Sequence, residues 1–155
     1  MTSAHIEVIQ GYEVRTDLAY DRDSHLWVQR VGAAIAPRAR VGMDALEVAT
    51  TGTLAQVALV GPGAVLRRGE AYGSVEAEKF VGPLVSPVSG RVWAVNSAVE
   101  SDPGLLERDP YGSWLIELEL EAPEECSQLV QGPPEVRAWF DSAVSEYKLR
   151  GVLAE

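Results

Sequence analysis

Lysine is nearly absent from this chain of 155 residues. Lys79 and Lys148 are its two lysines, so the other eleven of the thirteen basic side chains are arginine. Arginine stays protonated in proteins, whereas lysine can lose its proton and attack an acyl group. Lys79 stands just before the turn Gly82-Pro83, and this placement suggests a covalent role. An arginine-rich genome that left one lysine on a surface turn would explain the same pattern.

Cysteine and long hydrophobic runs are scarce as well. The single cysteine, Cys126, excludes an intrachain disulfide framework. The acids beside it, Glu124 and Glu125, are expected to raise the pKa of its thiol, so we do not expect a reactive thiolate. The N-terminus shows no basic-then-apolar signal pattern, and no apolar run is long enough to cross a bilayer. We therefore expect a cytoplasmic protein.

Positive charge is in short supply compared with negative charge. The formal net charge of −10 makes nucleic acids and anionic membranes poor partners. Two histidines and one cysteine, far apart in the chain, do not suggest metal ligands, and no phosphate-binding loop or nucleophile elbow is present. The length and the 46% hydrophobic content favour one domain over 1–155, with a core at about 12–121.

Short strands separated by glycine and proline dominate the pattern. We expect strands over 6–16, 26–36, 53–60, 84–95 and 114–121, short helical turns at 43–49 and 103–106, a loop over 123–133, and an amphipathic helix over about 134–149. Pro134 suits the first turn of that helix. This arrangement predicts a small β-barrel or sandwich closed by a C-terminal helix. The four tryptophans, Trp27, Trp93, Trp114 and Trp139, are expected in the core.

A β-hairpin is predicted around Lys79. From Ala71 the residues alternate, which places Tyr72, Ser74, Glu76 and Glu78 on one face, with the acids toward water. Gly82 can adopt the positive φ that a tight reversal requires. Lys79 is then at or beside the hairpin tip.

Four segments, in order, resemble the H protein of the glycine cleavage system. They are Tyr-Asp-Arg-Asp-Ser-His-Leu-Trp-Val at 20–28, the Gly-Glu-x-x-Gly-x-Val-Glu pattern at 69–76, Lys-Phe-Val-Gly-Pro-Leu-x-Ser-Pro-Val-Ser-Gly at 79–90, and a closing segment at 96–115. The resemblance spans about 20–120. It implies a mainly β, lipoyl/biotinyl-type barrel-sandwich hybrid with short helices and a C-terminal amphipathic helix.

The resemblance also implies a non-catalytic lipoyl carrier. Lipoate would be joined by an amide to Lys79, and Glu76, three residues earlier as in the family's Glu-Ser-Val-Lys, would be read by the lipoate ligase or lipoyl transferase. Pathway enzymes would load and unload the arm. His25 would contact the arm. Simpler interpretations remain open: Glu76 as a solvent-facing strand acid, and His25 as a turn residue that caps Asp23 or a backbone group.

Departures from the family pattern leave alternatives open. Glu78 is an extra acid beside the acceptor lysine, expected to favour the charged ammonium and slow modification. The segment 42–60 also differs from the glycine cleavage pattern. Lipoate-binding proteins of sulfur oxidation, which act with a heterodisulfide-reductase-like complex, have a similar hairpin, and the divergent surface makes this branch of the family a candidate as well. A biotinyl carrier is disfavoured because Glu78 and Phe80, not methionines, flank Lys79. An unmodified scaffold domain of the same fold is the third alternative.

Overall fold

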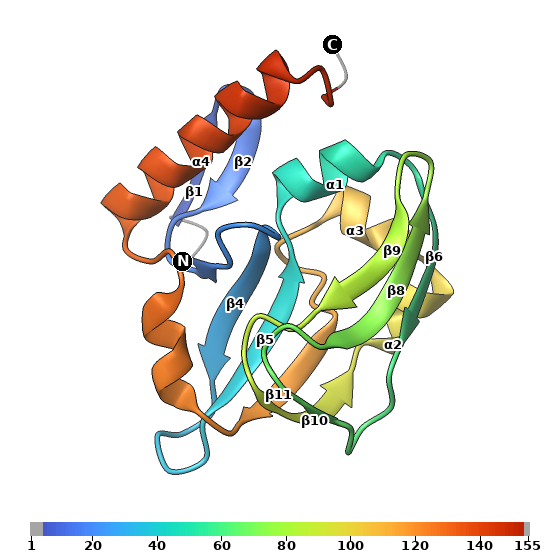
Figure 1. Ribbon diagram of the computed structural model, residues 1–155, viewed down its shortest axis with the longest axis vertical. Coiled ribbons are helices and arrows are strands. Elements are labelled where there is room, and N and C mark those ends of the chain that lie inside the picture. Colours follow the sequence, from blue (N-terminus) through green and yellow to red (C-terminus); the bar gives the residue numbers. More distant parts are fainter. Residues whose placement is uncertain (1–4, 154–155) are drawn as a thin grey trace.

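Two antiparallel sheets enclose the main hydrophobic core (Figure 1). The structure is a computed structural model that describes residues 5–153. The larger sheet has the order β3-β4-β5-β11-β10-β7 and the smaller one the order β6-β8-β9. Their bounds are β3 Ala19–Tyr20, β4 Leu26–Val31, β5 Arg38–Met43, β6 Leu54–Leu59, β7 Val65–Leu66, β8 Ala71–Ala77, β9 Val81–Val85, β10 Gly90–Val95 and β11 Ile116–Leu120. Buried side chains of both sheets form one cluster, so the sheets pack face to face.

A second, smaller core lies under the two ends of the chain. The N-terminal strands β1 (Ile6–Ile9) and β2 (Tyr12–Arg15) form a hairpin that packs beside the helix α4 (Pro133–Leu149) (Figure 1). The sequence predicted one strand over 6–16. Gln10 and Gly11 instead take φ values of 51° and 92°, the two positive values that a two-residue hairpin turn needs. The predicted C-terminal helix is confirmed, and its buried face covers this second core.

Short helices connect the strands. They are α1 (Ala45–Thr51), α2 (Ser97–Ser101), α3 (Leu105–Arg108) and the 3-10 helix η2 (Pro123–Gln128). The first and third confirm the predicted helical turns, whereas η2 replaces part of a predicted loop. It buries Cys126, and burial, more than the charge of Glu125, raises the pKa of that thiol.

The hairpin that carries Lys79 differs in detail from the sequence prediction. The predicted strand at 84–95 is two strands, since β9 pairs with β8 in the small sheet and β10 with β11 in the large one. A β-bulge between Ala71 and Gly73 changes the alternation, so Tyr72 is fully buried and not on the outer face. Ser74, Glu76 and Glu78 are exposed as expected.

One of the four tryptophans is not in the core. Trp27 and Trp139 are buried and Trp114 is partly buried, but Trp93 is 53% exposed. A register shift in β10 between Val92 and Ala94 falls on this residue. Its indole ring lies on the outer surface of the sheet, where the Arg38 guanidinium is 4.9 Å from the ring centroid. The prediction that all four are core residues is therefore wrong for Trp93.

Candidate functional site

Lys79 lies in the turn of residues 78–80 that joins β8 to β9, hereafter the Lys79 turn. Within the turn, the Ala77 amide donates to the Phe80 carbonyl at 2.8 Å. Two further backbone bonds fix the turn to the end of α1 and the residues that follow it: Lys79 N donates to the carbonyl of Thr51, the last residue of α1, and Glu78 N donates to Thr53 O, each at 2.9 Å. Figure 1 shows the hairpin tip beside the C-terminal end of α1. The backbone of Lys79 is therefore held on two sides.

The side chain of Lys79 extends from this anchored backbone into solvent. It is exposed, and among residues 5–153 its ammonium enters no ion pair. The Glu78 carboxylate is directed instead toward Gly52 and the Thr53 amide. Glu78 therefore does not act on the Lys79 ammonium in the way that its place in the sequence suggested. Glu76 is exposed on β8, opposite Val81 of β9.

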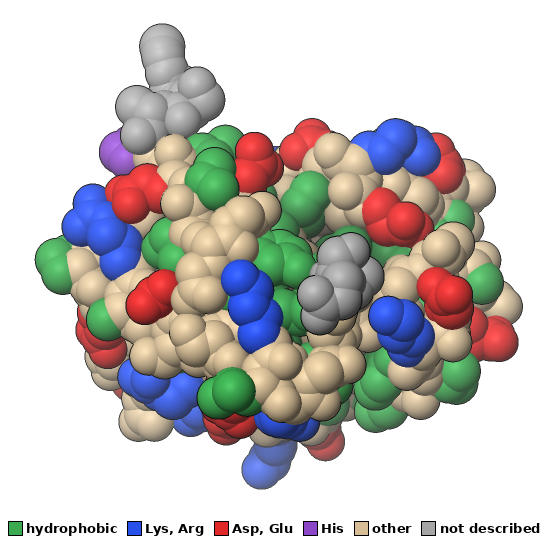
Figure 2. Space-filling model, turned by 90° about the horizontal axis from the view of Figure 1, so that it is seen from above, with side chains coloured by type: hydrophobic (Ala, Val, Ile, Leu, Met, Phe, Trp, Pro, Cys, Tyr) green, Lys and Arg blue, Asp and Glu red, His purple; other side chains and the backbone are tan. Residues whose placement is uncertain are grey.

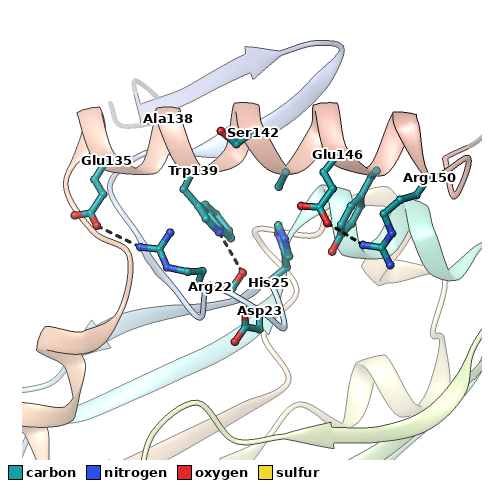
Figure 3. Close-up of a pocket in the computed structure, with 11 residues that line it drawn as sticks. Arg22, Asp23, His25, Glu135, Ala138, Trp139, Ser142, Glu146 and Arg150 are labelled. Atoms are coloured by element: carbon teal, nitrogen blue, oxygen red, sulfur yellow. Dashed lines mark hydrogen bonds and ion pairs between the residues drawn. The ribbon is translucent and has the colours of Figure 1, made fainter.

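His25 is buried beneath α4 and pairs with Asp44. It has a φ of 62°, is 2% exposed, and its Nδ1 is 2.8 Å from Asp44 Oδ2. The Trp139 ring stacks on the imidazole at 4.5 Å between centroids (Figure 3). The alternative in which His25 caps Asp23 is wrong. The left-handed backbone of His25 turns its ring inward, and Asp44 accepts its hydrogen bond.

The charges of His25, Asp44 and Glu47 depend on one another. Burial is the largest influence on His25 and disfavours the imidazolium, but the hydrogen bond and charge of Asp44, with smaller contributions from Glu47 and Asp21, raise the pKa of His25. For Glu47, burial together with the negative charge of Asp44 raises the pKa to about 7, against a smaller opposite effect of His25. Asp44 also accepts from the Glu47 amide at 2.8 Å and so caps α1.

Three adjoining hollows connect His25 with Lys79. The largest, about 590 Å³, lies between α4 and the turn at Arg22 and Asp23, and His25 lines it (Figure 3). A second of about 210 Å³ contains Lys79 and shares Tyr147 and Arg150 with the first. A third of about 150 Å³ shares Glu47, Thr51 and Phe80 with the second. Figure 2, which looks down on this end of the molecule, shows hydrophobic side chains among the charged ones.

The third hollow has the character of an apolar slot. Leu26 and Met43 of the large sheet and Val75 and Leu84 of the hairpin line it, and Phe80 stands at its boundary with the Lys79 hollow. Such a surface matches an alkyl chain, whereas the charged hollow under α4 does not. The slot opens beside the backbone that bears Lys79. Its lining therefore fits a flexible, largely apolar group attached to that lysine.

Sequence reasoning missed Asp44, the partner of His25, and several of the residues that the hollows share, namely Glu47, Tyr147 and Arg150. Asp44 and Glu47 form an Asp-x-x-Glu pattern at a helix start, the spacing of a capping motif, and that signal was available in the sequence. Tyr147 was assigned to the helix at 134–149 and Arg150 directly follows it, but nothing in their spacing indicated that they would line the hollow at Lys79. In the part of the chain that the structure describes, no helix is long and apolar enough to cross a membrane.

The two facing sheets with a lysine on a tight hairpin form the barrel-sandwich architecture predicted from the sequence. Residues 18–138 match the sequence profile of the family described as glycine cleavage H-protein. The glycine cleavage system H protein of Mycobacterium sp. (strain KMS) is 41% identical over 111 residues, 71% of this chain and 82% of that protein. A probable glycine cleavage system H protein 2 of Sulfolobus acidocaldarius is 32% identical over 137 residues, 86% of this chain and 90% of that protein.

A solved structure agrees with these sequence matches. The crystal structure of a glycine cleavage system H protein from Mycobacterium marinum matches with a TM-score of 0.62 at 33% identity, and covers 74% of this chain and 98% of that chain. The chain belongs to the glycine cleavage H-protein family. The profile ends at residue 138, within α4, and begins after β2. The N-terminal hairpin and most of α4 therefore lie outside the matched region.

Proposed function

We propose that this protein is a lipoyl carrier, with lipoate joined by an amide to Nζ of Lys79. The observation that carries the proposal is an exposed lysine whose backbone is fixed at a hairpin tip, in a chain of the glycine cleavage H-protein family. A rigid base with a free side chain suits a group that must reach several partner sites, because tethering raises its effective concentration at each. The second lysine, Lys148, is on α4 and bonds Gln10.

The hollows beside Lys79 supply a resting surface for the arm. When bound, lipoate supplies a dithiolane whose disulfide can be opened by a nucleophile. The apolar slot with Leu26, Met43 and Phe80 would shield that group from water. His25 lines the hollow under α4, so it would contact the arm only when the arm leaves the slot and extends beneath that helix. The role of the protein is to hold and present the arm, and partner enzymes perform the chemistry.

The partners follow from the family and from the attachment chemistry. A lipoate ligase or lipoyl transferase must form the amide, with Glu76 on the open face of β8 as the acid that it reads. The relatives named glycine cleavage system H protein favour the enzymes of that system as loading and unloading partners. We place these events in the cytoplasm. The alternative is that a heterodisulfide-reductase-like complex loads and unloads the arm, and the partner experiment below distinguishes the two.

Intact-mass measurement after expression with lipoate and a lipoate ligase tests the attachment site. We expect the gain of one lipoyl group, no gain in Lys79→Arg, and an unchanged gain in Lys148→Arg. Glu76→Gln should keep the fold and slow the gain. A biotinyl mass would establish the alternative carrier, and no gain at all would establish the unmodified scaffold. Modification that moves to Lys148 would show that the proposed site is wrong.

The lipoylated protein then identifies the pathway. Incubation with glycine decarboxylase and glycine should release the glycine carboxyl group as CO2 and, as the dithiolane S–S bond opens, load the aminomethyl group onto the arm, a mass change that Lys79→Arg cannot show. If the arm is instead turned over only by a heterodisulfide-reductase-like complex with a reduced sulfur substrate, the assignment to glycine cleavage is wrong while the carrier function stands.

A further inference from the structure

Glu78 packs against a glycine that ends α1. Gly52 is the C-cap of α1 with a φ of 75°, in the left-handed region that favours glycine. A Cβ atom at Gly52 would lie 2.7 Å from Glu78 Oε1 and 3.1 Å from Glu78 Cβ. A side chain at residue 52 would therefore force the Glu78 side chain to shift from its present place against α1.

In the same contact, the Glu78 carboxylate faces the Thr53 amide. Its Oε1 lies 3.4 Å from the Thr53 amide, a long hydrogen bond. The Glu78 amide donates to the Thr53 carbonyl at 2.9 Å, so residues 53 and 78 are joined by two bonds in opposite directions. The next residue, Lys79, bonds Thr51 on the other side of the glycine. Glu78 thus belongs to a clamp formed by Gly52, Thr53 and the Lys79 turn.

We propose that Glu78 is a positioning residue for Lys79: seated on Gly52, its side chain holds the Lys79 turn against the end of α1. This inference rests on Lys79 as the acceptor of the proposed function. It reverses the role that the sequence suggested. An acid beside a lysine is expected to keep the ammonium charged and to slow acylation. In the structure the carboxylate is engaged with the α1 end, so it supports presentation of the amine.

Two substitutions separate these roles because they differ in shape and charge. Glu78→Gln removes the charge but keeps an oxygen that can accept from Thr53, whereas Glu78→Ala removes both. If Glu78 positions Lys79, lipoylation of Glu78→Gln stays within about twofold of wild type, and that of Glu78→Ala falls by about two- to tenfold, as for loss of one hydrogen bond. If Glu78 restrains the amine by its charge, both variants are lipoylated faster.

Amide hydrogen exchange, measured by NMR, reports on the clamp without any lipoylation. We expect Glu78→Ala to lower the protection of the Glu78-position and Lys79 amides by about two- to tenfold, and Gly52→Ala to lower it by about tenfold or more, since strain at a positive φ adds to the collision with Glu78. The amides of β10 and β11 should be unaffected. Unchanged protection at position 79 in both variants would overturn the proposal.

Matched controls are available in the chain. Gly63 has a φ of 94° and no atom within 4 Å of an added Cβ, so Gly63→Ala carries the backbone strain without the contact. Glu121 is exposed and distant in sequence from the hairpin, so Glu121→Ala controls for loss of one acid. Neither should change exchange at Lys79. If wild type is never lipoylated, the proposed function fails, but the exchange data still decide whether the clamp exists.

Discussion

At the scale of single residues, the buried group under α4 links stability to pH. His25 has a raised pKa in the folded state, so its stabilising contribution is complete below its unfolded value and is lost as pH rises through the folded value. Glu47 acts in the same direction. Its pKa rises from an ordinary 4.5 to about 7, so the folded state binds its proton more tightly than the unfolded chain does. Both groups make the fold less stable as pH increases from about 5 to 8.

Replacing Glu47 by glutamine should remove the larger part of this dependence. The neutral amide carries no ionisation penalty, so Glu47→Gln should exceed wild type in free energy of unfolding by on the order of 2 to 3 kcal/mol at pH 8. Near pH 4.5, where the carboxyl group is protonated in the folded state, the difference should largely vanish. Urea denaturation at the two pH values measures it, with the exposed Glu121→Gln as control. If the two proteins differ equally in free energy of unfolding at both pH values, the pKa of Glu47 is not raised in the folded state.

At the scale of elements, α4 is held by an aromatic contact with the sheet. Trp139 stacks on His25, contacts Tyr20 at 5.1 Å between ring centroids, and donates its indole N–H to the Arg22 carbonyl at 3.1 Å. It is the largest of the buried side chains by which the helix packs on the second core. This contact also forms one wall of the largest hollow.

Two tryptophan substitutions should differ sharply in their effect on stability. Trp139→Ala removes a buried aromatic side chain and should lower the free energy of unfolding by about 3 to 5 kcal/mol. Trp93→Ala removes an exposed ring and one cation–π contact, so a loss of about 1 kcal/mol or less is expected. Chemical denaturation followed by circular dichroism compares the two. Similar losses would mean that the second core contributes little.

The elements also show where sequence reasoning succeeds. The amphipathic helix at 134–149 and the Lys79 hairpin were predictable because each follows from local spacing. The turn itself differs from the prediction, since Gly82 lies in β9 and does not have a positive φ. The buried position of Tyr72 was not, since a bulge moved it to the other face. The exposure of Trp93 likewise depends on an irregular register that no spacing reveals.

At the scale of the whole molecule, the candidate site is assembled from distant parts of the chain. Lys79 and Glu76, the proposed site residues, were selected from one segment of sequence, and lipoate was predicted from the family resemblance alone. The partnership of His25 with Asp44, and of Glu78 with Gly52, required the fold, because each joins residues 19 and 26 positions apart on different elements. The hollow at Lys79 even includes Arg150, beyond the matched family region.

Lipoylation should be visible in the charge of the whole protein. An amide at Lys79 replaces one ammonium, so the formal net charge changes from −10 to −11. The modified form should elute later than the unmodified form from an anion-exchange column. Lys79→Gln, which carries the same charge as the modified protein, should show a single peak at that later position with or without ligase. A second, later peak from this variant would reveal modification elsewhere.

Helix α1 spans seven residues, about 10 Å, with a different anchor at each end. The Asp44 carboxylate, before its first residue, accepts a hydrogen bond from the buried His25 imidazole, and the carbonyl of Thr51, its last residue, accepts one from the amide of Lys79, the proposed acceptor. This one short helix therefore joins the buried His25–Asp44 pair to the Lys79 turn, although the imidazole and the amine share no direct contact.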